Sequence, residues 1–266
     1  MNKDFIHNYK SPSFGGFGEA VPLSEGSFTV DKTKTFVPFN EQQDNVQNRP
    51  IGSILVEVQP FVIITNRDII LLDTGLGFNI NGKLQLLHNL QQHKIEPQQI
   101  TKVLLTHLHK DHAGGVTYKN ENTGKYEITF PNATHYIQER EFENAVLTNS
   151  ASFSSEKLLC LKNLPNIVWL SNDEGNIDGY IQYKLTAAHS QYHQVFWIHT
   201  EDKIIFYGGD DAPQYQQIKN KLVAKYDYNG RLAMELRQQW REQGEKEHWT
   251  FLFYHDIKTP VFSFSA

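Results

Sequence analysis

Short apolar runs bounded by polar or turn-forming residues recur along the first half of the chain. Two β-branched runs after Ile51, ILVEV and FVIIT, precede the segment DIILLDTG, and the apolar run Lys102–Leu105 follows later. Runs of this length and composition are typical of β-strands. We expect the first three to form a β-meander, preceded by an entry strand at Gly26–Val30 and a loop at Thr35–Pro50.

Three other segments show the near-helical spacing of apolar residues that predicts a helix with one buried side. They comprise residues 82–93, a segment that begins near Gln138, and residues 229–244. Further strands are predicted for the runs ITF, IQYKL, VFWIH, KIIFY and WTFLFY. No linker or low-complexity tract divides the chain, so we expect one domain over residues 1–266. The periodicity by itself indicates only a mixed α/β architecture.

The composition narrows the class of protein without identifying it. The chain has 266 residues, of which 39% are hydrophobic, enough for a full-sized core. Its formal net charge of -5 gives no global positive field, so we expect no nucleic-acid partner. The N-terminus lacks a secretory signal, and no stretch approaches the roughly 20 apolar residues that cross a bilayer, so we expect a cytoplasmic protein without a membrane partner. The single cysteine, Cys160, excludes an internal disulfide and is expected to be a small core residue.

The segment THLHKDHAGG, directly after the apolar run VLL, carries the clearest chemical signal. Its three imidazoles, of His107, His109 and His112, and the carboxylate of Asp111 lie within six consecutive positions. Zinc favours imidazole nitrogen and accepts carboxylate oxygen, and a turn after a strand can aim such side chains at one point. The two glycines that follow leave the backbone free to turn tightly. The sequence therefore predicts a metal site at the end of this strand.

The pattern HxHxDH resembles the central motif of the metallo-β-lactamase superfamily. The other motifs of the family occur in the expected order, in LLDTGLG, FPNA, AAHSQYH, IIFYGGDDAP and FYHD, so the resemblance covers nearly the whole chain. It implies a four-layer αβ/βα sandwich of the α/β (α+β) class. By pattern the nearest branch is that of quorum-quenching N-acyl homoserine lactonases, on the segments LSEGSFTV and FYHD.

The resemblance also implies a set of ligands for two metal ions. One ion would be held by His107, His109 and His189 and the other by Asp111, His112 and His255, while Asp210 would bridge them and Asp73 would support the ligands from behind. Asp211 is the alternative bridging residue if the motif is displaced by one position. His193 corresponds to a histidine that does not usually bind metal. The implied cofactors are two Zn²⁺ per chain, although Mn²⁺ or Fe²⁺ also suits nitrogen and oxygen ligands.

Such a site predicts hydrolysis of an ester-like bond, because two divalent ions lower the pKa of a shared water toward neutrality and polarise the substrate oxygen. The implied substrate is a small-molecule lactone or related carboxylic ester, with a phosphodiester or phosphotriester as the alternative, and a metal-binding sensor without turnover as a third hypothesis. Asp111 could orient the hydroxide or carry a proton to the leaving group. Tyr215 is a candidate for holding the substrate, or equally an ordinary partly buried tyrosine.

Two further expectations concern residues outside the motifs. The loop Thr35–Pro50, with Phe36 and Phe39, either covers the site as an apolar wall or is a plain surface loop. No role is assigned to the remaining histidines, whose contexts favour exposure or a satisfied hydrogen bond. These are His7, His88, His93, His135, His199 and His248.

Overall fold

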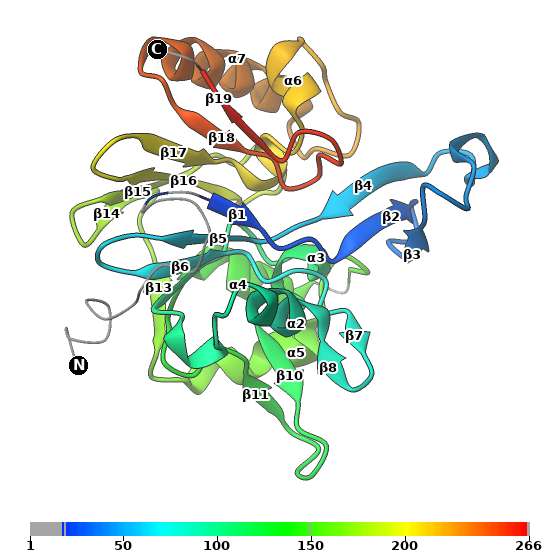
Figure 1. Cartoon of the computed structure of the whole chain (residues 1–266), viewed down its shortest axis with the longest axis vertical. Helices are drawn as coiled ribbons and strands as arrows, with labels where there is room; N and C mark the ends of the chain where they lie inside the picture. The colour runs from blue at the N-terminus through cyan, green and yellow to red at the C-terminus, as the bar shows by residue number, and fades with distance from the viewer. Residues whose placement is uncertain (1–17, 19, 149, 265–266) are drawn as a thin grey trace.

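The protein is described here by a computed structural model that covers residue 18 and residues 20–148 and 150–264, so His7 lies outside the described residues. Two six-stranded mixed sheets pack face to face (Figure 1). The first has the order β1-β5-β6-β9-β12-β13 and the second the order β14-β15-β16-β17-β18-β19. The strands of the first sheet are β1 (Ala20–Pro22), β5 (Phe61–Ile64), β6 (Ile69–Leu72), β9 (Lys102–Leu104), β12 (Thr134–Gln138) and β13 (Ile167–Leu170). Those of the second are β14 (Glu174–Ile177), β15 (Ile181–Leu185), β16 (Gln194–His199), β17 (Ile204–Tyr207), β18 (Thr250–Leu252) and β19 (Val261–Ser263).

Helices cover the outer face of each sheet, which confirms the expected αβ/βα sandwich (Figure 1). The core between the sheets contains buried side chains of both, such as Ile70 and Ile205, and a separate apolar cluster lies under the helices on either side. The three predicted helices are confirmed with shifted ends. The helices are α2 (Gln85–Gln92), α3 (Lys110–Ala113), α4 (Glu139–Leu147), α5 (Ser155–Leu159), α6 (Tyr215–Lys219) and α7 (Gly230–Lys246), with 3-10 turns η1 (Val46–Asn48), η2 (Pro97–Gln99), η3 (Cys160–Asn163) and η4 (Gly209–Asp211).

The prediction of a three-stranded β-meander is wrong for its first strand, which belongs to another sheet. The strand β4 (Ile54–Val58) pairs with β2 (Gly26–Val30) in a separate three-stranded sheet, and only β5 and β6 form the expected hairpin. The chain changes sheets at Gln59 and Pro60, where the Gln59 amide donates to the backbone oxygens of Phe253 and Asp256 at 2.9 and 2.7 Å. Because proline has no amide hydrogen to continue a ladder, the apolar run is interrupted there.

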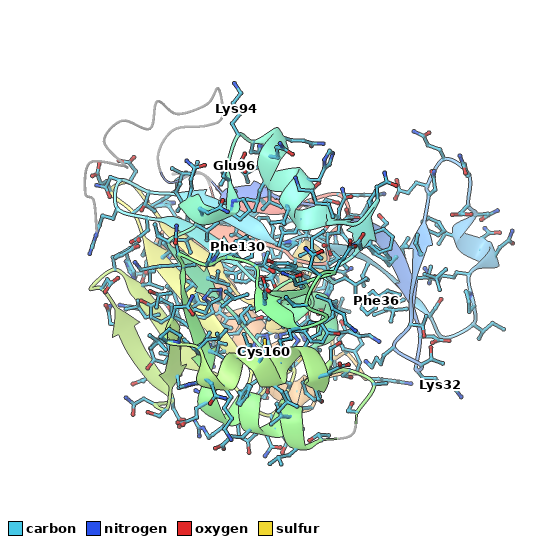
Figure 2. The ribbon with its side chains drawn as sticks, turned by 90° about the horizontal axis from the view of Figure 1, so that it is seen from below. Lys32, Phe36, Lys94, Glu96, Phe130 and Cys160 are labelled. Atoms are coloured by element: carbon cyan, nitrogen blue, oxygen red, sulfur yellow. The ribbon has the colours of Figure 1, made fainter. Side chains whose placement is uncertain are left out.

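The three-stranded sheet extends from the side of the sandwich (Figure 1). Its third strand, β3 (Phe36–Phe39), together with η1, replaces much of the loop expected at Thr35–Pro50. Phe36 packs edge-on against the buried Phe28 with ring centroids 6.1 Å apart, which anchors the hairpin. Figure 2 shows Phe36 and Lys32 on this sheet, apart from the helical layer that carries Cys160. Short hairpins are formed by β7 (Asn79–Ile80) with β8 (Lys83–Leu84) and by β10 (Thr117–Lys119) with β11 (Tyr126–Ile128).

Four strands end at the same edge of the sandwich. The strand β6 runs parallel to β9 in the first sheet, and β17 runs parallel to β18 in the second. In open α/β sheets, sites form outside the carboxyl ends of such parallel strands. Asp73, His107, Asp210 and His255 all follow one of these strand ends within three residues. No helix among the described residues combines the length and the apolar content needed to cross a bilayer.

Candidate metal centre

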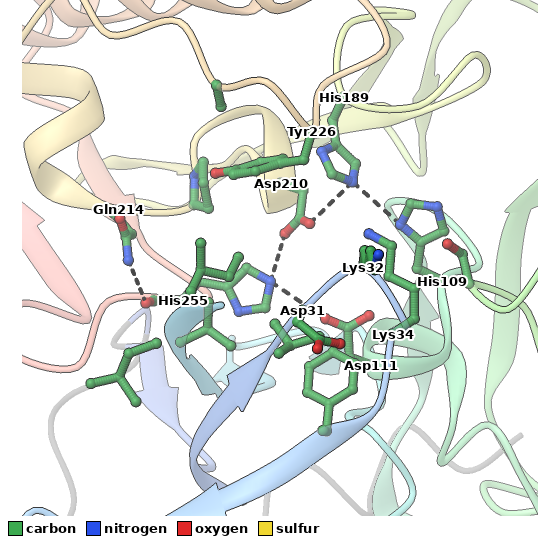
Figure 3. A pocket seen from close by; sticks show the side chains of 18 of the residues that line it. Asp31, Lys32, Lys34, His109, Asp111, His189, Asp210, Gln214, Tyr226 and His255 are labelled. Atoms are coloured by element: carbon green, nitrogen blue, oxygen red, sulfur yellow. Dashed lines mark hydrogen bonds and ion pairs between the residues drawn. The ribbon is translucent and has the colours of Figure 1, made fainter. Parts of the chain in front are cut away.

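Seven side chains from four segments, which follow β9, β15, β17 and β18, converge at this edge as two groups. His107, His109, His189 and Asp210 form one, and Asp111, His112 and His255 form the other. In the first group the Nδ1 of His109 lies 2.9 Å from the Nε2 of His107. It also lies 3.3 Å from the Nε2 of His189 (Figure 3). In the second, a carboxylate oxygen of Asp111 lies 3.7 Å from the Nε2 of His112 and 3.5 Å from that of His255.

Asp210 faces both groups with different oxygens. Its Oδ1 lies 3.0 Å from the Nε2 of His112 and 3.0 Å from that of His255, while its Oδ2 lies 3.2 Å from the Nε2 of His189 (Figure 3). The neighbouring Asp211 is turned the other way: one oxygen accepts the backbone N–H of His189 at 2.7 Å, and the other lies 3.1 Å from His193. The geometry therefore places Asp210 between the two groups, and Asp211 behind them.

The donor atoms fit metal ions rather than mutual hydrogen bonds. Two ligands bound tetrahedrally to zinc at 2.0–2.1 Å are separated by roughly 3.3 Å, close to the separations found in the first group. The buried Nε2 of His112 and Oδ1 of Asp210 have no hydrogen-bond partner among the described residues, although they lie 3.0 Å apart. Buried polar atoms that converge without hydrogen bonding require another partner. The two clusters are thus consistent with a dinuclear metal site.

Three of the imidazoles are oriented by an oxygen on the side opposite the cavity, which leaves the other nitrogen facing the cavity. His112 Nδ1 lies 2.7 Å from Asp73 Oδ2, His107 Nδ1 lies 3.0 Å from the Thr106 hydroxyl, and His255 Nδ1 lies 2.6 Å from the backbone oxygen of Glu57. Asp73 contacts none of the cavity-facing nitrogens, in keeping with its expected supporting role. Its carboxylate also accepts the hydroxyls of Tyr207 at 2.6 Å and Thr106 at 2.8 Å, so its left-handed backbone (φ +53°) is firmly held.

Two buried carboxylates near the site were not predicted from the sequence. Asp227, in the segment KYDY, lies 3.0 Å from the Nδ1 of His189, and Glu141 of α4 accepts the backbone N–H of Leu108 at 3.0 Å. Asp227 belongs to no motif, and the only sequence signal is an acidic residue between two aromatic ones. Glu141 lies on the inward side of a predicted helix, where a carboxylate is unusual and indicates a specific partner.

The sequence suggested that the glycines after His112 allow a tight turn of the backbone, but the structure gives a different reason for Gly114. Gly114 has ordinary helical dihedrals (φ −63°), so no unusual backbone conformation requires it. A Cβ at this position would instead lie 2.1 Å from the backbone oxygen of Leu76, in the loop after Asp73. The glycine therefore permits the close approach of two loops that carry site residues.

The protonation of the imidazoles follows their surroundings. Burial lowers the pKa of His107 and His109 well below the usual value, so both are neutral and able to bind a cation. Burial also disfavours the charged form of His112, but the carboxylates of Asp210, Asp111 and Asp73 outweigh it and raise its pKa well above the usual value. Because a ligand nitrogen must be deprotonated, a metal held by the second group would have to displace a proton from His112.

A cavity of about 580 Å³ opens over the two groups, within the usual size for a small-molecule site. Its wall combines apolar side chains, such as Phe36 and Ile54, with the cationic side chains of Lys34 and Lys110. Tyr226 also lines it, and its ring lies beside the ring of His189 (Figure 3), with centroids 6.0 Å apart.

Tyr215 is placed elsewhere. Its ring packs against Phe262 and Phe253, with centroids 4.6 and 5.9 Å apart, and it is not among the described residues that line the cavity. The geometry therefore favours the second reading of Tyr215, an ordinary partly buried tyrosine, because α6 turns this side chain toward the layer of aromatic residues on the outer face of the second sheet.

The five described histidines to which the sequence assigned no role belong to neither group. His88 and His248 are exposed, His93 and His199 are half-buried, and His135 is fully buried in β12. Cys160 is half-buried at the start of η3 and packs against the core under the helices.

Comparison with known proteins agrees with this geometry. The sequence profile of the Metallo-beta-lactamase superfamily matches residues 55–255, so the chain belongs to this superfamily. A probable metal-dependent hydrolase from Staphylococcus aureus is similar in structure, with a TM-score of 0.74 and 20% identity over 94% of both chains. AidC, a dizinc quorum-quenching lactonase, gives a TM-score of 0.68 and 18% identity over 93% of this chain and 91% of its own. The hydrolase AbOPH, of the beta lactamase superfamily, gives a TM-score of 0.69 and 21% identity over 95% of this chain and 92% of its own. No curated protein matches the chain significantly.

Proposed function

We propose that the protein is a metal-dependent hydrolase of a lactone or related carboxylic ester. The observation that carries this proposal is the position of Asp210 between two His/Asp groups at the floor of a small-molecule cavity. His107, His109 and His189 would hold one ion and Asp111, His112 and His255 the other, with Asp210 shared. When bound, a pair of divalent ions supplies a hydroxide nucleophile near neutral pH and polarises the oxygen of the scissile bond.

Asp111 is suited to guide protons during such a reaction. Its carboxylate lies 3.5 Å from His255 and lines the cavity, so one oxygen faces the space above the metal groups. A carboxylate in this position orients a nucleophilic water and then passes its proton to the leaving alkoxide. This role needs no serine or cysteine nucleophile, and Cys160 lies in the layer of helices.

Tyr226 takes the substrate-holding role that the sequence suggested for Tyr215. Its hydroxyl accepts a hydrogen bond from the Gln217 amide at 3.1 Å, which leaves its own proton free to donate. Burial raises the pKa of Tyr226 to about 12, so the hydroxyl stays protonated at neutral pH. Placed on the cavity wall beside His189, it is suited to donate to a substrate carbonyl oxygen or to the oxyanion that forms from it.

The apolar part of the wall supports an acyl substrate. Phe36, Ile54, Leu222 and Val223 line the cavity and offer a surface for a hydrocarbon chain. The similarity in fold to a lactonase solved with its product supports the same substrate class. A phosphoester hydrolase is the second candidate, because the cationic residues Lys34 and Lys110 on the same wall suit a phosphate oxygen.

The decisive experiment combines metal analysis with hydrolysis assays. Purified protein is expected to contain about two metal ions per chain and to hydrolyse N-hexanoyl homoserine lactone, and His109→Ala is expected to reduce kcat/KM by at least about a hundredfold. Preferential cleavage of bis(4-nitrophenyl) phosphate would overturn the lactone assignment in favour of the second candidate. Protein that binds two metals but turns over neither substrate class would contradict the hydrolase proposal and favour a sensor.

A further inference from the structure

The turn between β2 and β3 presents two lysines to the metal centre. The carboxylate of Asp31 accepts the backbone N–H and the hydroxyl of Thr33 at 2.9 and 2.6 Å, and its backbone oxygen accepts the N–H of Lys34 at 3.0 Å. These bonds hold the backbone of Lys34 in the left-handed region at φ +57°, a conformation that residues other than glycine rarely adopt. Figure 3 shows Lys32 and Lys34 reaching over the cavity beside His109 and Asp111.

A third lysine, from a different part of the chain, lines the same cavity. Lys110 begins α3, between His109 and Asp111, and its ammonium lies 5.9 Å from the centroid of the Phe36 ring. Lys34 and Lys110 are both half-buried, and each lines the cavity. The charge of Lys34 acts on both Lys110 and His109, although the carboxylate of Asp111 acts on Lys110 more strongly.

Neither of these half-buried cations forms a close ion pair with a described carboxylate. Among the described residues, no carboxylate oxygen lies within 4.0 Å of the ammonium of Lys34 or Lys110. Asp31, the acidic residue of the turn, is engaged by Thr33, and Asp111 faces the histidines of the second group. Gathering like charges at a partly buried position destabilises the free protein, so the arrangement indicates a complementary anion.

We propose that Lys34 and Lys110 form a binding subsite for an anionic oxygen group of the substrate, a carboxylate or a phosphate. This inference rests on the proposed hydrolase function and deepens it by specifying the charge of the substrate. Lys32 is exposed and adds to the positive electrostatic potential at the cavity, but it is not part of the subsite. The apolar wall next to Phe36 accepts the uncharged part of the same molecule, so the preferred substrate is amphipathic with its charge at the lysine side, and a neutral lactone is turned over without using this subsite.

Matched pairs of esters that differ in charge provide the test. The carboxylic pair is 4-nitrophenyl butyrate and mono-4-nitrophenyl glutarate, and the phosphate pair is diethyl 4-nitrophenyl phosphate and bis(4-nitrophenyl) phosphate. Lys34→Asn removes the charge while keeping a residue that tolerates the left-handed turn. We expect this substitution, and Lys110→Gln, to reduce the preference for the anionic over the neutral ester about tenfold in kcat/KM. The exposed Lys162→Gln should leave that preference unchanged.

Calorimetric binding gives a readout that does not depend on turnover. Glutarate and inorganic phosphate are titrated into metal-loaded wild type and Lys34→Asn protein of equal measured metal content, so that any contact of the anion with the metals is the same in both. We expect a Kd about tenfold higher in the variant for at least one anion. The anion with the larger increase in Kd identifies the natural group as a carboxylate or a phosphate. Equal Kd values for both anions, or an unchanged charge preference, would overturn the subsite. Loss of anion binding in a protein that hydrolyses no ester would retain the subsite and reject the hydrolase.

Discussion

The Nδ1 of His189 lies 3.0 Å from the carboxylate of Asp227, whose side chain is fully buried. The other oxygen of Asp227 lies 3.8 Å from a guanidinium nitrogen of Arg237, which is itself buried in α7. Arg237 also donates to the backbone oxygen of Leu222 at 3.0 Å. One arginine thus fixes both the carboxylate behind His189 and the loop on which Tyr226 lies.

Removing this carboxylate should weaken the first metal group. We expect Asp227→Ala to lower the affinity for one of the two ions by about 10–100-fold, because acceptors behind a ligand histidine fix its orientation and basicity. Competition with a fluorescent chelator measures the change. Asp227→Asn keeps an acceptor oxygen, so its metal affinity should fall less than that of Asp227→Ala. Asp202→Ala, at an exposed position, serves as the control. Unchanged affinity in Asp227→Ala would show that His189 needs no such support.

The adjacent aspartates Asp210 and Asp211 should differ in the property that each controls. Asp210→Asn is expected to reduce the metal content from about two ions to about one and kcat/KM by at least about a hundredfold, because it faces both groups. Asp211→Asn is expected to keep both ions but to lower the free energy of unfolding by about 1–3 kcal/mol, because its buried carboxylate accepts the Thr186 hydroxyl and the His189 N–H. Elemental analysis and urea unfolding separate the two effects. The reverse pattern would exchange the two assignments.

The candidate ligands could be predicted because they belong to short motifs that follow strand ends. The strands before Asp73, His107, Asp210 and His255 are rich in apolar residues, and the parallel pairing of β6 with β9 and of β17 with β18 brings these residues to one edge. The match between local pattern and topology allows a family resemblance to locate the site.

What the sequence did not show depends on contacts between distant residues. The pairing of β4 with β2 is decided by the change of sheets at Pro60, which no periodicity reveals. The strand β12 was missed because Thr134, His135 and Gln138 interrupt its apolar pattern, and these polar groups are tolerated only through hydrogen bonds made in the folded state. Asp227 reaches His189 through a loop held by Arg237 of α7.

The two tyrosines considered for the substrate can be compared directly. Tyr226→Phe is expected to lower kcat/KM by about 10–100-fold, mainly through kcat, because it removes a donor to the developing oxyanion. Tyr215→Phe should change kcat/KM by less than about twofold, since its ring packs in an aromatic cluster away from the cavity. Steady-state kinetics of both variants on the same ester provide the measurement. A large effect of Tyr215→Phe with none for Tyr226→Phe would restore the expectation from the sequence.

His135 predicts a pH dependence of stability that is independent of the metal centre. It is fully buried in β12 between Val103 and Ile167, its Nδ1 donates to the backbone oxygen of Ala133 at 3.1 Å, and burial lowers its pKa to about 4. The unfolded chain, with a histidine pKa of about 6.5, therefore binds more protons than the folded chain between pH 6.5 and 4.

The contribution of His135 is thus present above pH 6.5 and is lost as the pH falls toward 4. Integrating the two titrations gives a loss of about 2 kcal/mol in the free energy of unfolding between pH 7 and pH 5. In His135→Leu this part of the pH dependence of the free energy of unfolding should vanish, whatever the absolute stability of the variant. Urea unfolding at both pH values measures it, and His88→Leu, at an exposed histidine, is the matched control. A variant that loses as much stability on acidification as the wild type would show that His135 is protonated in the folded protein.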